Sequence, residues 1–364
     1  MKCAGCGAKL QFEDPEKPGF IPKDVLERRL AEGKEILCQR CFKLKHYGKY
    51  EPVEFSSDFK KELKNILESF KLILWVIDIT DFEGSYREDI KNLLKGKKII
   101  YVVNKIDLLP KALSYKELKD WLKKKIKTDY PEDIRLVSSK TGFGINSLKK
   151  HILSFGYDKA LTIGISNTGK SSLVNRLAEH TTLVSPLPGT TLGILKRKLK
   201  NARFYIYDTP GIMTKDRAID LLSVECQYKI AKSNRLTRKT FKIDQKRAIL
   251  VGGMAYITVD YEGNLKPIFQ VFTYENVVLH ETNINKAKEL WEKRKGDFLV
   301  PPCKKKELNG ITFKESNFNM EEEKELVMPG LFWINVKRGP FKIKIYHPEN
   351  VPLKLRDRLI KPKR

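Results

Sequence analysis

Residues 164–172 read GISNTGKSS, a loop with paired glycines and a lysine followed by serine. It matches G-x4-G-K-[ST] after a strand-like apolar run and at the start of a helical pattern. Backbone N–H groups at such a helix start wrap phosphate oxygens. Lys170 would bridge the β- and γ-phosphates and Ser171 would ligate Mg²⁺. The alternative is a glycine turn joining strand to helix. The candidate nucleotide-binding residues are Gly164, Ser166, Asn167, Thr168, Gly169, Lys170, Ser171 and Ser172.

A second motif, N-K-x-D, ends the upstream run 97–104 and consists of Asn104, Lys105 and Asp107. The Asp107 carboxylate can accept hydrogen bonds from N1–H and N2–H₂ of guanine, which adenine cannot supply. Asn104 would brace the loop, and the Lys105 stem would lie over the base. A Ser139 backbone N–H could reach guanine O6. The pair predicts a guanine pocket, with ordinary loop polarity as the alternative; its second loop is Ser138, Ser139 and Lys140.

Two further motifs follow the phosphate loop, PLPGTTLG at 186–193 and DTPG at 208–211. Asp208 is positioned to hold Mg²⁺ through water, and the Gly211 N–H to contact the γ-phosphate. We choose Thr191 over Thr190 as the second hydroxyl on the metal. Ile212 occupies the place of a water-orienting glutamine, so water must be activated in another way. The predicted magnesium site is Ser171, Thr191 and Asp208.

The elements that must position these motifs alternate along the chain. Apolar strand-like runs near 71–78, 97–104, 134–139, 160–164 and 203–208 are separated by helical patterns. Such alternation predicts an α/β fold with a doubly wound, mostly parallel sheet, which places the strand ends at one edge. Beyond about 240 the sequence becomes β-rich. The expected domains are a cysteine-rich segment at 1–52, a nucleotide-binding domain at 53–215 and a β-rich domain at 216–364.

The order of the motifs is rotated relative to ordinary GTPases, because the guanine motifs precede the phosphate loop. In this it resembles circularly permuted GTPases, in which the chain ends have moved. The leading C-x-G-C and C-Q-R-C-F-x-L-x-H-Y segments, at Cys3–Cys6 and Cys38–Tyr47, make the chain similar to the YqeH-type family. The resemblance covers nearly the whole chain, with distinctive motifs up to residue 211.

This resemblance implies a GTPase acting in assembly of the small (30S) ribosomal subunit, with ribosomal RNA as partner. It implies a C-terminal domain similar to the tryptophan RNA-binding attenuation protein and proposed to bind RNA. Asn167 matches the asparagine that coordinates K⁺ in related GTPases. The implied ligands are GTP or GDP, Mg²⁺, Zn²⁺ and K⁺, and the candidate catalytic residues are Lys170, Thr191, Asn167 and Gly211.

Four of the six cysteines form two C-x2-C pairs near the N-terminus. Two such pairs in a cytosolic protein predict a structural tetrahedral Zn²⁺ site. The alternative is redox chemistry, although no thioredoxin-like pattern surrounds either pair. His46 is a candidate for surface or RNA contact. Cys226 and Cys303 are expected to be isolated and inert. The predicted zinc ligands are Cys3, Cys6, Cys38 and Cys41.

The net charge is +26, from 71 basic and 45 acidic side chains, and it is spread along the chain. Residues 212–364 carry 31 Lys and Arg against 19 Asp and Glu, or +12, which leaves +14 on the rest. Such an excess favours a polyanionic partner such as RNA. No apolar run reaches the roughly 20 residues of a membrane span, and no signal peptide is expected, so we predict a cytoplasmic protein.

Three weaker features have two interpretations each. Asp78 and Asp81 resemble paired catalytic carboxylates, but capping near the nucleotide site is favoured. Three aromatic residues among basic ones could stack on RNA bases or pack in the core, which is favoured. The tail 354–364 is either a mobile basic arm or an electrostatic contact. The aromatic residues are Phe332, Trp333 and Phe341.

The sequence leaves three functional hypotheses. The first is a slow GTPase switch on ribosomal RNA, in which positioning and electrostatics perform the chemistry. The second is an RNA-binding module that uses GTP only for structural order. The third is a GTPase domain within a nucleic-acid-modifying enzyme, for which no second catalytic constellation is visible. Whether an activator protein is needed cannot be inferred.

Overall fold

The chain divides into two compact units, which are described separately. The computed structural model describes residues 1, 3–4, 9–15, 19–39, 42, 52–111, 113–179, 183–185, 194–231, 233 and 235–361. The first unit is Met1–Ile79, Ser85–Asp107 and Thr128–Met213, and the second is Thr80–Gly84, Leu108–Lys127 and Thr214–Arg364. Two short segments of the expected nucleotide-binding domain therefore group with the C-terminal residues. No described helix is long and apolar enough to cross a bilayer.

A seven-stranded sheet forms the centre of the first unit, in the order β4-β3-β2-β5-β8-β7-β6. The strands from β4 to β8 are parallel, and β7 and β6 are added antiparallel. This arrangement confirms the predicted mostly parallel sheet. The strands are β2 (Leu72–Asp78), β3 (Lys98–Asn104), β4 (Ile134–Leu136), β5 (Lys159–Gly164), β6 (Leu183–Ser185), β7 (Ile194–Lys198) and β8 (Tyr205–Asp208).

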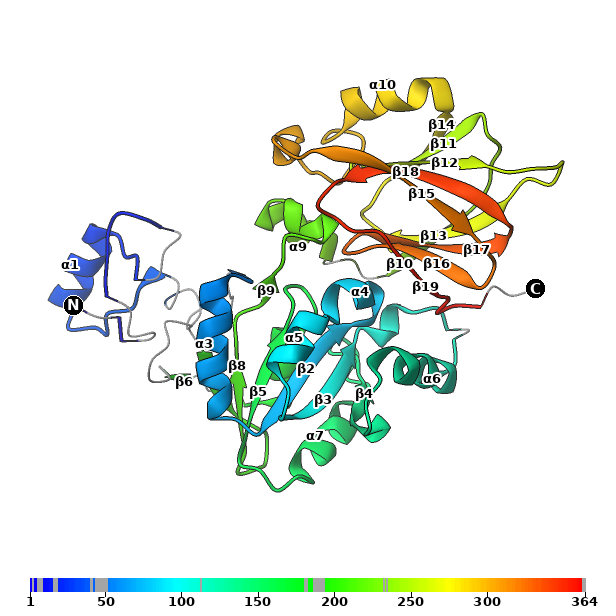
Figure 1. Cartoon of the computed structure of the whole chain (residues 1–364). Coiled ribbons are helices and arrows are strands. Elements are labelled where there is room, and N and C mark those ends of the chain that lie inside the picture. The colour runs from blue at the N-terminus through cyan, green and yellow to red at the C-terminus, as the bar shows by residue number, and fades with distance from the viewer. Residues whose placement is uncertain are drawn as a thin grey trace. The chain divides into compact units, whose positions relative to one another are not determined.

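Both faces of this sheet are buried. Leu74 of β2 shares a hydrophobic cluster with Leu148 and Leu173, from the helices that follow β4 and β5. On the opposite face Trp75 stacks on Tyr86, with ring centroids 5.0 Å apart. Because side chains alternate along a strand, an uninterrupted apolar run places apolar groups on both faces. The helices of this unit are α3 (Ser57–Glu68), α5 (Glu88–Leu93), α7 (Ile145–Leu153) and α8 (Lys170–Leu177), of which α3 and α5 lie in front of the sheet in Figure 1.

The N-terminal segment has its own small core. Leu10, Ile21 and Leu37 pack with two cysteines, Cys3 and Cys38, all of them buried. Helix α1 (Lys23–Ala31) has no buried residue of its own. Downstream, β1 (Val53–Glu54) pairs in parallel with β9 (Ile212–Met213). So few apolar residues give a segment of this size little stability without an additional crosslink or metal.

Two five-stranded antiparallel sheets build the second unit, as the β-rich sequence predicts. Their orders are β10-β13-β17-β16-β19 and β14-β11-β12-β18-β15. The strands are β10 (Leu236–Lys242), β11 (Arg247–Val251), β12 (Ala255–Asp260), β13 (Ile268–Tyr274), β14 (Leu279–Asn283), β15 (Phe313–Met320), β16 (Lys324–Met328), β17 (Phe332–Arg338), β18 (Phe341–Pro348) and β19 (Lys354–Asp357).

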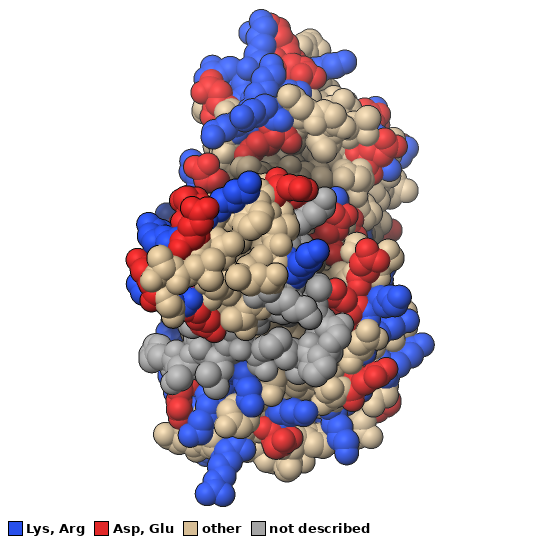
Figure 2. Space-filling view, turned by 90° about the vertical axis from the view of Figure 1, so that its left-hand side faces the viewer, with Lys and Arg blue, Asp and Glu red and all other residues tan. Residues whose placement is uncertain are grey.

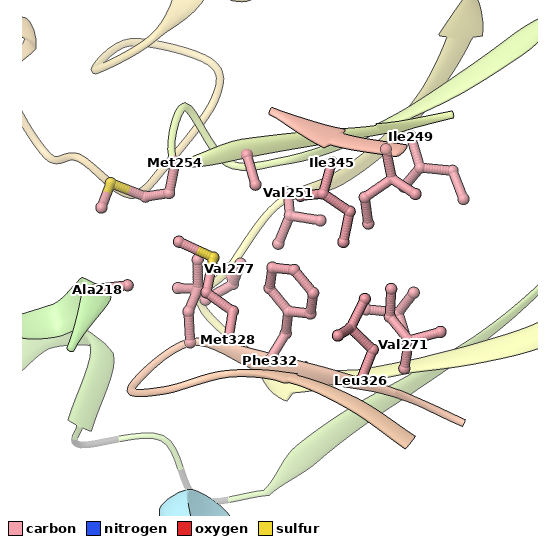
Figure 3. Packing of buried hydrophobic residues seen from close by; sticks show 14 of the residues in the cluster. Ala218, Ile249, Val251, Met254, Val271, Val277, Leu326, Met328, Phe332 and Ile345 are labelled. Carbon is pink, nitrogen blue, oxygen red and sulfur yellow. The ribbon is translucent and has the colours of Figure 1, made fainter. Parts of the chain in front are cut away.

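The core of the second unit lies between these sheets. Ile249 and Ile345 from the β11–β18 sheet face Val271, Leu326 and Phe332 from the other sheet (Figure 3). These side chains occupy alternate positions along their strands, as expected when each sheet buries one face. The unit is therefore a β-sandwich.

Helices of the second unit cover parts of the sandwich. Trp291 of α10 is buried with Ala248 and Leu250 on the outer face of β11. Helix α6 begins with a capping box, in which Ser114 and Glu117 satisfy each other's backbone N–H groups. The remaining elements are α4 (Phe82–Ser85), α6 (Tyr115–Ile126), α9 (Val224–Ala231), α10 (Ile284–Arg294) and five 3-10 turns, η1 (Ile79–Asp81), η2 (Ile106–Leu108), η3 (Pro131–Asp133), η4 (Ala218–Leu221) and η5 (Lys305–Leu308).

Two cysteines of this unit, Cys226 and Cys303, contradict the sequence-based expectation. They form a disulfide, with Cα atoms 5.6 Å apart across 77 residues of sequence. The prediction that they are isolated is wrong, because the chain before η5 returns to α9. Their spacing in the sequence carries no sign of this contact.

The three aromatic residues weighed for RNA stacking are all in the interior. Phe332, Trp333 and Phe341 are 2%, 3% and 4% exposed. Trp333 stacks on Phe272, with ring centroids 4.9 Å apart, and Phe341 stacks on Phe269 at 5.5 Å. Core packing is confirmed for them, and base stacking is excluded in this conformation.

The basic excess is distributed over the surface. Lys and Arg side chains are interspersed with Asp and Glu over the described part of the face in Figure 2. This agrees with the even division of the charge along the sequence. A polyanion would therefore meet many separated positive charges on this face.

Candidate functional site

The predicted nucleotide motifs of the first unit lie at one edge of its parallel sheet. The phosphate loop follows β5, the N-K-x-D motif follows β3, and the D-x-x-G motif begins at the last residue of β8. The Ser-Ser-Lys loop comes shortly after β4. Since these strands are parallel neighbours, their carboxyl ends must lie together.

The phosphate loop has the tight backbone expected between β5 and α8. Asn167 and Gly169 have positive φ values of 69° and 83°. A Cβ atom on residue 169 would lie 2.4 Å from Asn104 Nδ2, which leaves space only for glycine. Thr168 Oγ1 donates to the Ile165 carbonyl at 2.9 Å. Ser171 at the helix start is half-buried, and Ser172 is exposed.

Lys170 lies in the interior of this loop and is 5% exposed. Its Nζ contacts Asp208 Oδ1 and the Thr209 carbonyl. Asp208 is fully buried at the end of β8. The structure therefore brings together the cation predicted for the phosphates and the carboxylate predicted for Mg²⁺, which neutralise each other here.

Asn104 connects three parts of the site. Its Nδ2 donates to the Thr168 carbonyl at 2.9 Å and to Ser139 Oγ at 3.1 Å. Its Oδ1 accepts the Ser139 N–H at 2.9 Å. The bracing role predicted for Asn104 thus has a concrete geometry. The Ser139 N–H proposed for guanine O6 is engaged by Asn104 instead, because that side chain offers the nearer acceptor.

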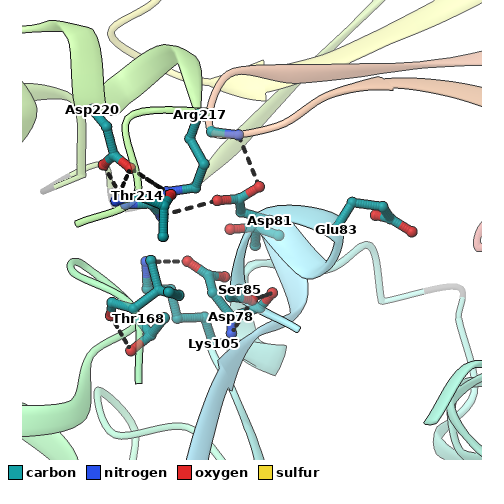
Figure 4. A network of polar contacts seen from close by, with 12 residues as sticks. Asp78, Asp81, Glu83, Ser85, Lys105, Thr168, Thr214, Arg217 and Asp220 are labelled. Atoms are coloured by element: carbon teal, nitrogen blue, oxygen red, sulfur yellow. Dashed lines mark hydrogen bonds and ion pairs between the residues drawn. The ribbon is translucent and has the colours of Figure 1, made fainter. Parts of the chain in front are cut away.

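The rest of the N-K-x-D motif presents one carboxylate to solvent. Asp107 is exposed, as a group that must meet a ligand requires. Lys105 has φ 65° and its Nζ is 2.5 Å from Asp78 Oδ2. Ser85 Oγ accepts the Asp78 N–H at 3.0 Å and donates to the Asp78 carbonyl at 3.2 Å (Figure 4). The favoured supporting interpretation of Asp78 agrees with these contacts.

Arg176 of α8 is a supporting residue that the sequence motifs do not include. Its Nε donates to the Ser139 carbonyl at 2.6 Å, and its Nη2 contacts the Lys140 carbonyl. Within the loop, Ser138 Oγ accepts the Thr141 N–H at 2.9 Å. Arg176 thereby ties the loop to the helix that begins with the phosphate motif. Only its position, two turns into that helix, could have suggested this role.

The D-x-x-G loop packs directly on the phosphate loop. The Ser166 N–H donates to the Ile212 carbonyl at 2.7 Å. A Cβ atom on residue 211 would lie 3.1 Å from Ser166 Cα, so glycine permits this approach. Ile212 is fully buried and belongs to β9. Thr190 and Thr191 lie outside the described residues.

Asp81 lies in the second unit and takes part in a buried ionic network (Figure 4). Arg217 Nη1 is 3.1 Å from Asp81 Oδ2, and Arg217 also binds Asp220. The Gly330 N–H donates to Asp81 Oδ1 at 2.8 Å. Burial opposes the charged guanidinium, but the Asp220 and Asp81 carboxylates outweigh it and raise the pKa of Arg217. These contacts replace the predicted role of Asp81 in capping near the nucleotide site.

Two of the four predicted zinc ligands are described. Cys3 and Cys38 are 2% and 0% exposed. The Cys38 N–H donates to Cys3 Sγ at 3.1 Å. Amide donation to sulfur suits a thiolate that binds a metal. Cys6, Cys41 and His46 lie outside the described residues.

Two family descriptions match the chain. The description "YqeH-like, C-terminal" matches residues 266–359. The description "50S ribosome-binding GTPase" matches residues 159–273. The first range falls in the β-sandwich, and the second begins with the strand that precedes the phosphate loop.

Two curated relatives match most of the chain. "Uncharacterized protein YqeH" of Bacillus subtilis is 30% identical over 98% of this chain and 99% of its own length. "NO-associated protein 1, chloroplastic/mitochondrial" of Arabidopsis thaliana is 24% identical over 92% of this chain and 69% of its own. Among solved structures, GNP-bound YlqF from T. maritima is 22% identical over 45% of this chain and 64% of its own, with a TM-score of 0.31.

Proposed function

The chain belongs to the YqeH family of circularly permuted GTPases, and from this we propose that it hydrolyses GTP as a switch in assembly of the small ribosomal subunit. GTP binding is the property that the family supports most directly. Hydrolysis, the ribosomal partner and the metal ions belong to the proposal. The YqeH relative matches nearly end to end, so the proposal concerns the whole chain.

One observation carries the proposal. Asn104 of the guanine motif donates to the Thr168 carbonyl of the phosphate loop at 2.9 Å. Segments in permuted order along the chain thus form one hydrogen-bonded pocket. A pocket that couples a base-reading carboxylate to a phosphate loop suits a guanine nucleotide.

The residues present fit the ions that the family implies. Ser171, Thr191 and, through water, Asp208 would hold Mg²⁺, which neutralises phosphate charge when bound. Asn167 would hold K⁺ at the same loop. The Lys170 ammonium, now beside Asp208, would bind the β- and γ-phosphates, so nucleotide binding must exchange this ion pair for a new one. No described side chain of the site suits a general base, and positioning and charge are left to lower the barrier.

The proposed partner is ribosomal RNA. A net charge of +26 favours a polyanion, and its spread suits a surface that contacts many phosphates. With the aromatic residues inside the sandwich, recognition would depend on backbone contacts more than on base stacking. We also propose a cytoplasmic location, where ribosomes assemble.

Turnover and ribosome binding test this function together. In Mg²⁺ and K⁺ we expect GTP hydrolysis that drops when Na⁺ replaces K⁺. We also expect the chain to sediment with small ribosomal subunits more strongly with a non-hydrolysable GTP analogue than with GDP. Absence of hydrolysis, with or without RNA, would favour an RNA-binding module in which GTP is a structural ligand. Equal sedimentation with both nucleotides would contradict the switch.

We further propose that Cys3, Cys6, Cys38 and Cys41 hold one structural Zn²⁺. The buried N–H to sulfur contact between Cys38 and Cys3 supports this, as does the small core around them. Zinc bound by four thiolates contributes folding free energy to segments that lack a sufficient core.

Replacing Cys38 with serine is expected to lower zinc content from about one ion per chain to none, since a structural site needs its full set of four ligands. Elemental analysis of the purified full-length variant measures this. Cys226→Ala, in the second unit, is the matched control and should keep the zinc. Equal zinc in the Cys38→Ser variant and the native chain would refute the site.

A further inference from the structure

The Cys226–Cys303 disulfide joins two segments of the second unit that no nucleotide motif includes. Cys226 is fully buried on α9, and Cys303 is half-buried just before η5. The bond closes 77 residues of chain, including the strands β10 to β14. It therefore fastens α9 to the part of the chain that follows α10.

Glu307 holds the two sides of this bond together independently of the sulfur atoms. Its carboxylate accepts the Cys303 N–H at 2.8 Å and contacts Ser223 Oγ. Ser223 Oγ in turn accepts the Cys226 N–H at 3.3 Å. A polar frame thus spans both segments, and the two sulfur atoms would remain neighbours with the bond open.

The two sulfur atoms differ in access and in surroundings. Cys303 is partly exposed and is followed by three lysines, Lys304–Lys306. Nearby cations favour a thiolate, the nucleophilic form of cysteine. Cys226 is inaccessible to solvent, so only the neighbouring sulfur can reach it. Such a pair has an attacking thiol and a resolving thiol, as reversible redox cysteines do.

We propose that Cys226 and Cys303 form a reversible thiol–disulfide site, with small-molecule disulfides of the glutathione type as its oxidants. The Cys303 thiolate attacks the small disulfide RSSR, forming a mixed disulfide and releasing RS⁻. The Cys226 thiol then loses its proton and attacks Cys303 sulfur, releasing the second RS⁻. The balance is one protein dithiol and one RSSR giving one protein disulfide and two RSH. Excess RSH reverses both steps.

The bond controls how firmly α9 is held. Cys226 and Ile230 of α9 share the sandwich core with Ala218 and Leu222 of the segment before it. With the bond closed, this stretch is covalently tied to the sandwich. With the bond open, the core contacts and the Glu307 frame hold it alone. Oxidation therefore restricts opening of residues 214–231, the part of the second unit that follows the D-x-x-G motif.

The proposal is tested on the full-length protein in buffers of varied reduced and oxidised glutathione. After acid quenching and thiol blocking, non-reducing peptide mass spectrometry measures the crosslinked peptide that contains both cysteines. We expect it to dominate in oxidising buffer and to disappear in reducing buffer. Limited proteolysis within 214–231 should accelerate at least about tenfold on reduction.

A Cys226→Ala/Cys303→Ala variant is the matched control, because it keeps the four N-terminal cysteines. Its cleavage should equal that of the reduced native chain in every buffer; Cys303→Ser alone serves if the double variant does not fold. A crosslink that never forms, or that resists reduced glutathione, would overturn the proposal. Loss of one zinc ion from the double variant would also overturn it, in favour of a metal held by Cys226, Cys303 and Glu307, whose ligand atoms lie within 4.8 Å of one another.

Discussion

Replacing Lys170 with alanine is expected to lower kcat/KM for GTP by about 10³-fold or more. The lysine supplies a buried positive charge where the transferred phosphoryl group becomes more negative, and removal of one such stabilising group costs about 10²–10³ in rate. Lys170 is the buried cation of the phosphate loop, and it already lies against Asp208. Steady-state hydrolysis and nucleotide affinity, measured separately, show how much of the loss is in binding.

This substitution also removes the partner of a buried carboxylate. Breaking a buried ion pair from one side costs about 3–5 kcal/mol, because the remaining charge is left uncompensated. Urea unfolding of Lys170→Ala should therefore show reduced stability. The double variant Lys170→Ala/Asp208→Asn should recover much of the stability but none of the turnover. If stability and turnover recovered together, Lys170 would have a structural role only.

Lys150→Ala is the matched control for the single variant. This lysine is exposed on α7 of the same unit. Its replacement should leave both stability and turnover unchanged. Wild-type turnover in Lys170→Ala would contradict the assignment of residues 164–172 as a phosphate loop.

Most of the site was predictable, because short motifs at strand ends carry their own geometry. Buried apolar runs predicted β2, β3 and β5 to within one or two residues of their observed bounds. Once these strands are parallel, the polar residues after them must share an edge. The proximity of Asn104 to Thr168 follows from the sheet, although 64 residues separate them.

What the sequence did not reveal depends on contacts without a local pattern. The Arg217–Asp81 ion pair spans 136 residues, and neither residue belongs to a recognisable motif. The Cys226–Cys303 bond depends on how the chain returns after α10. Likewise, an aromatic residue among lysines can face either side of a strand. Trp333 was decided by the register of β17 beside β13, which places it against Phe272.

Packing partners also explain the difference in domain boundaries. Residues 108–127 carry an ordinary amphipathic pattern that would suit a helix of the parallel sheet. In the structure α6 belongs to the second unit, where Trp121 Nε1 donates to the Asp357 carbonyl at 3.1 Å. Periodicity indicates that a helix has an apolar face, but it does not identify the surface on which that face packs.

Replacing Asp107 with asparagine is expected to weaken GTP binding by about 10²–10³-fold and to make xanthosine triphosphate the preferred ligand. The wild-type carboxylate accepts from guanine N1–H and N2–H₂, and hydrogen bonds to a charged group contribute about 1.5–3 kcal/mol each. In the variant, the asparagine oxygen can still accept from N1–H. Its NH₂ group, however, would face the guanine NH₂, so two donors would oppose each other.

Xanthine reverses this mismatch, because it carries a carbonyl oxygen where guanine carries the amino group. The side-chain amide of the Asp107→Asn variant would then make two matched hydrogen bonds, whereas the wild-type carboxylate would be repelled by that carbonyl. Competition between the two triphosphates, measured by fluorescent nucleotide displacement, tests both directions of the exchange. Asp129→Asn, at another exposed aspartate of the first unit, should leave the preference for GTP intact.

The exchange of preference separates base recognition from general damage to the pocket. A damaged loop would lose affinity for both nucleotides, whereas a changed reading group loses one and gains the other. Asp107 is exposed, and no described hydrogen bond or ion pair of its carboxylate has to be broken by the substitution, so the fold should tolerate it. Unchanged preference for GTP in Asp107→Asn would mean that another group reads the purine. In that case the N-K-x-D motif at β3 would serve only to brace the phosphate loop through Asn104.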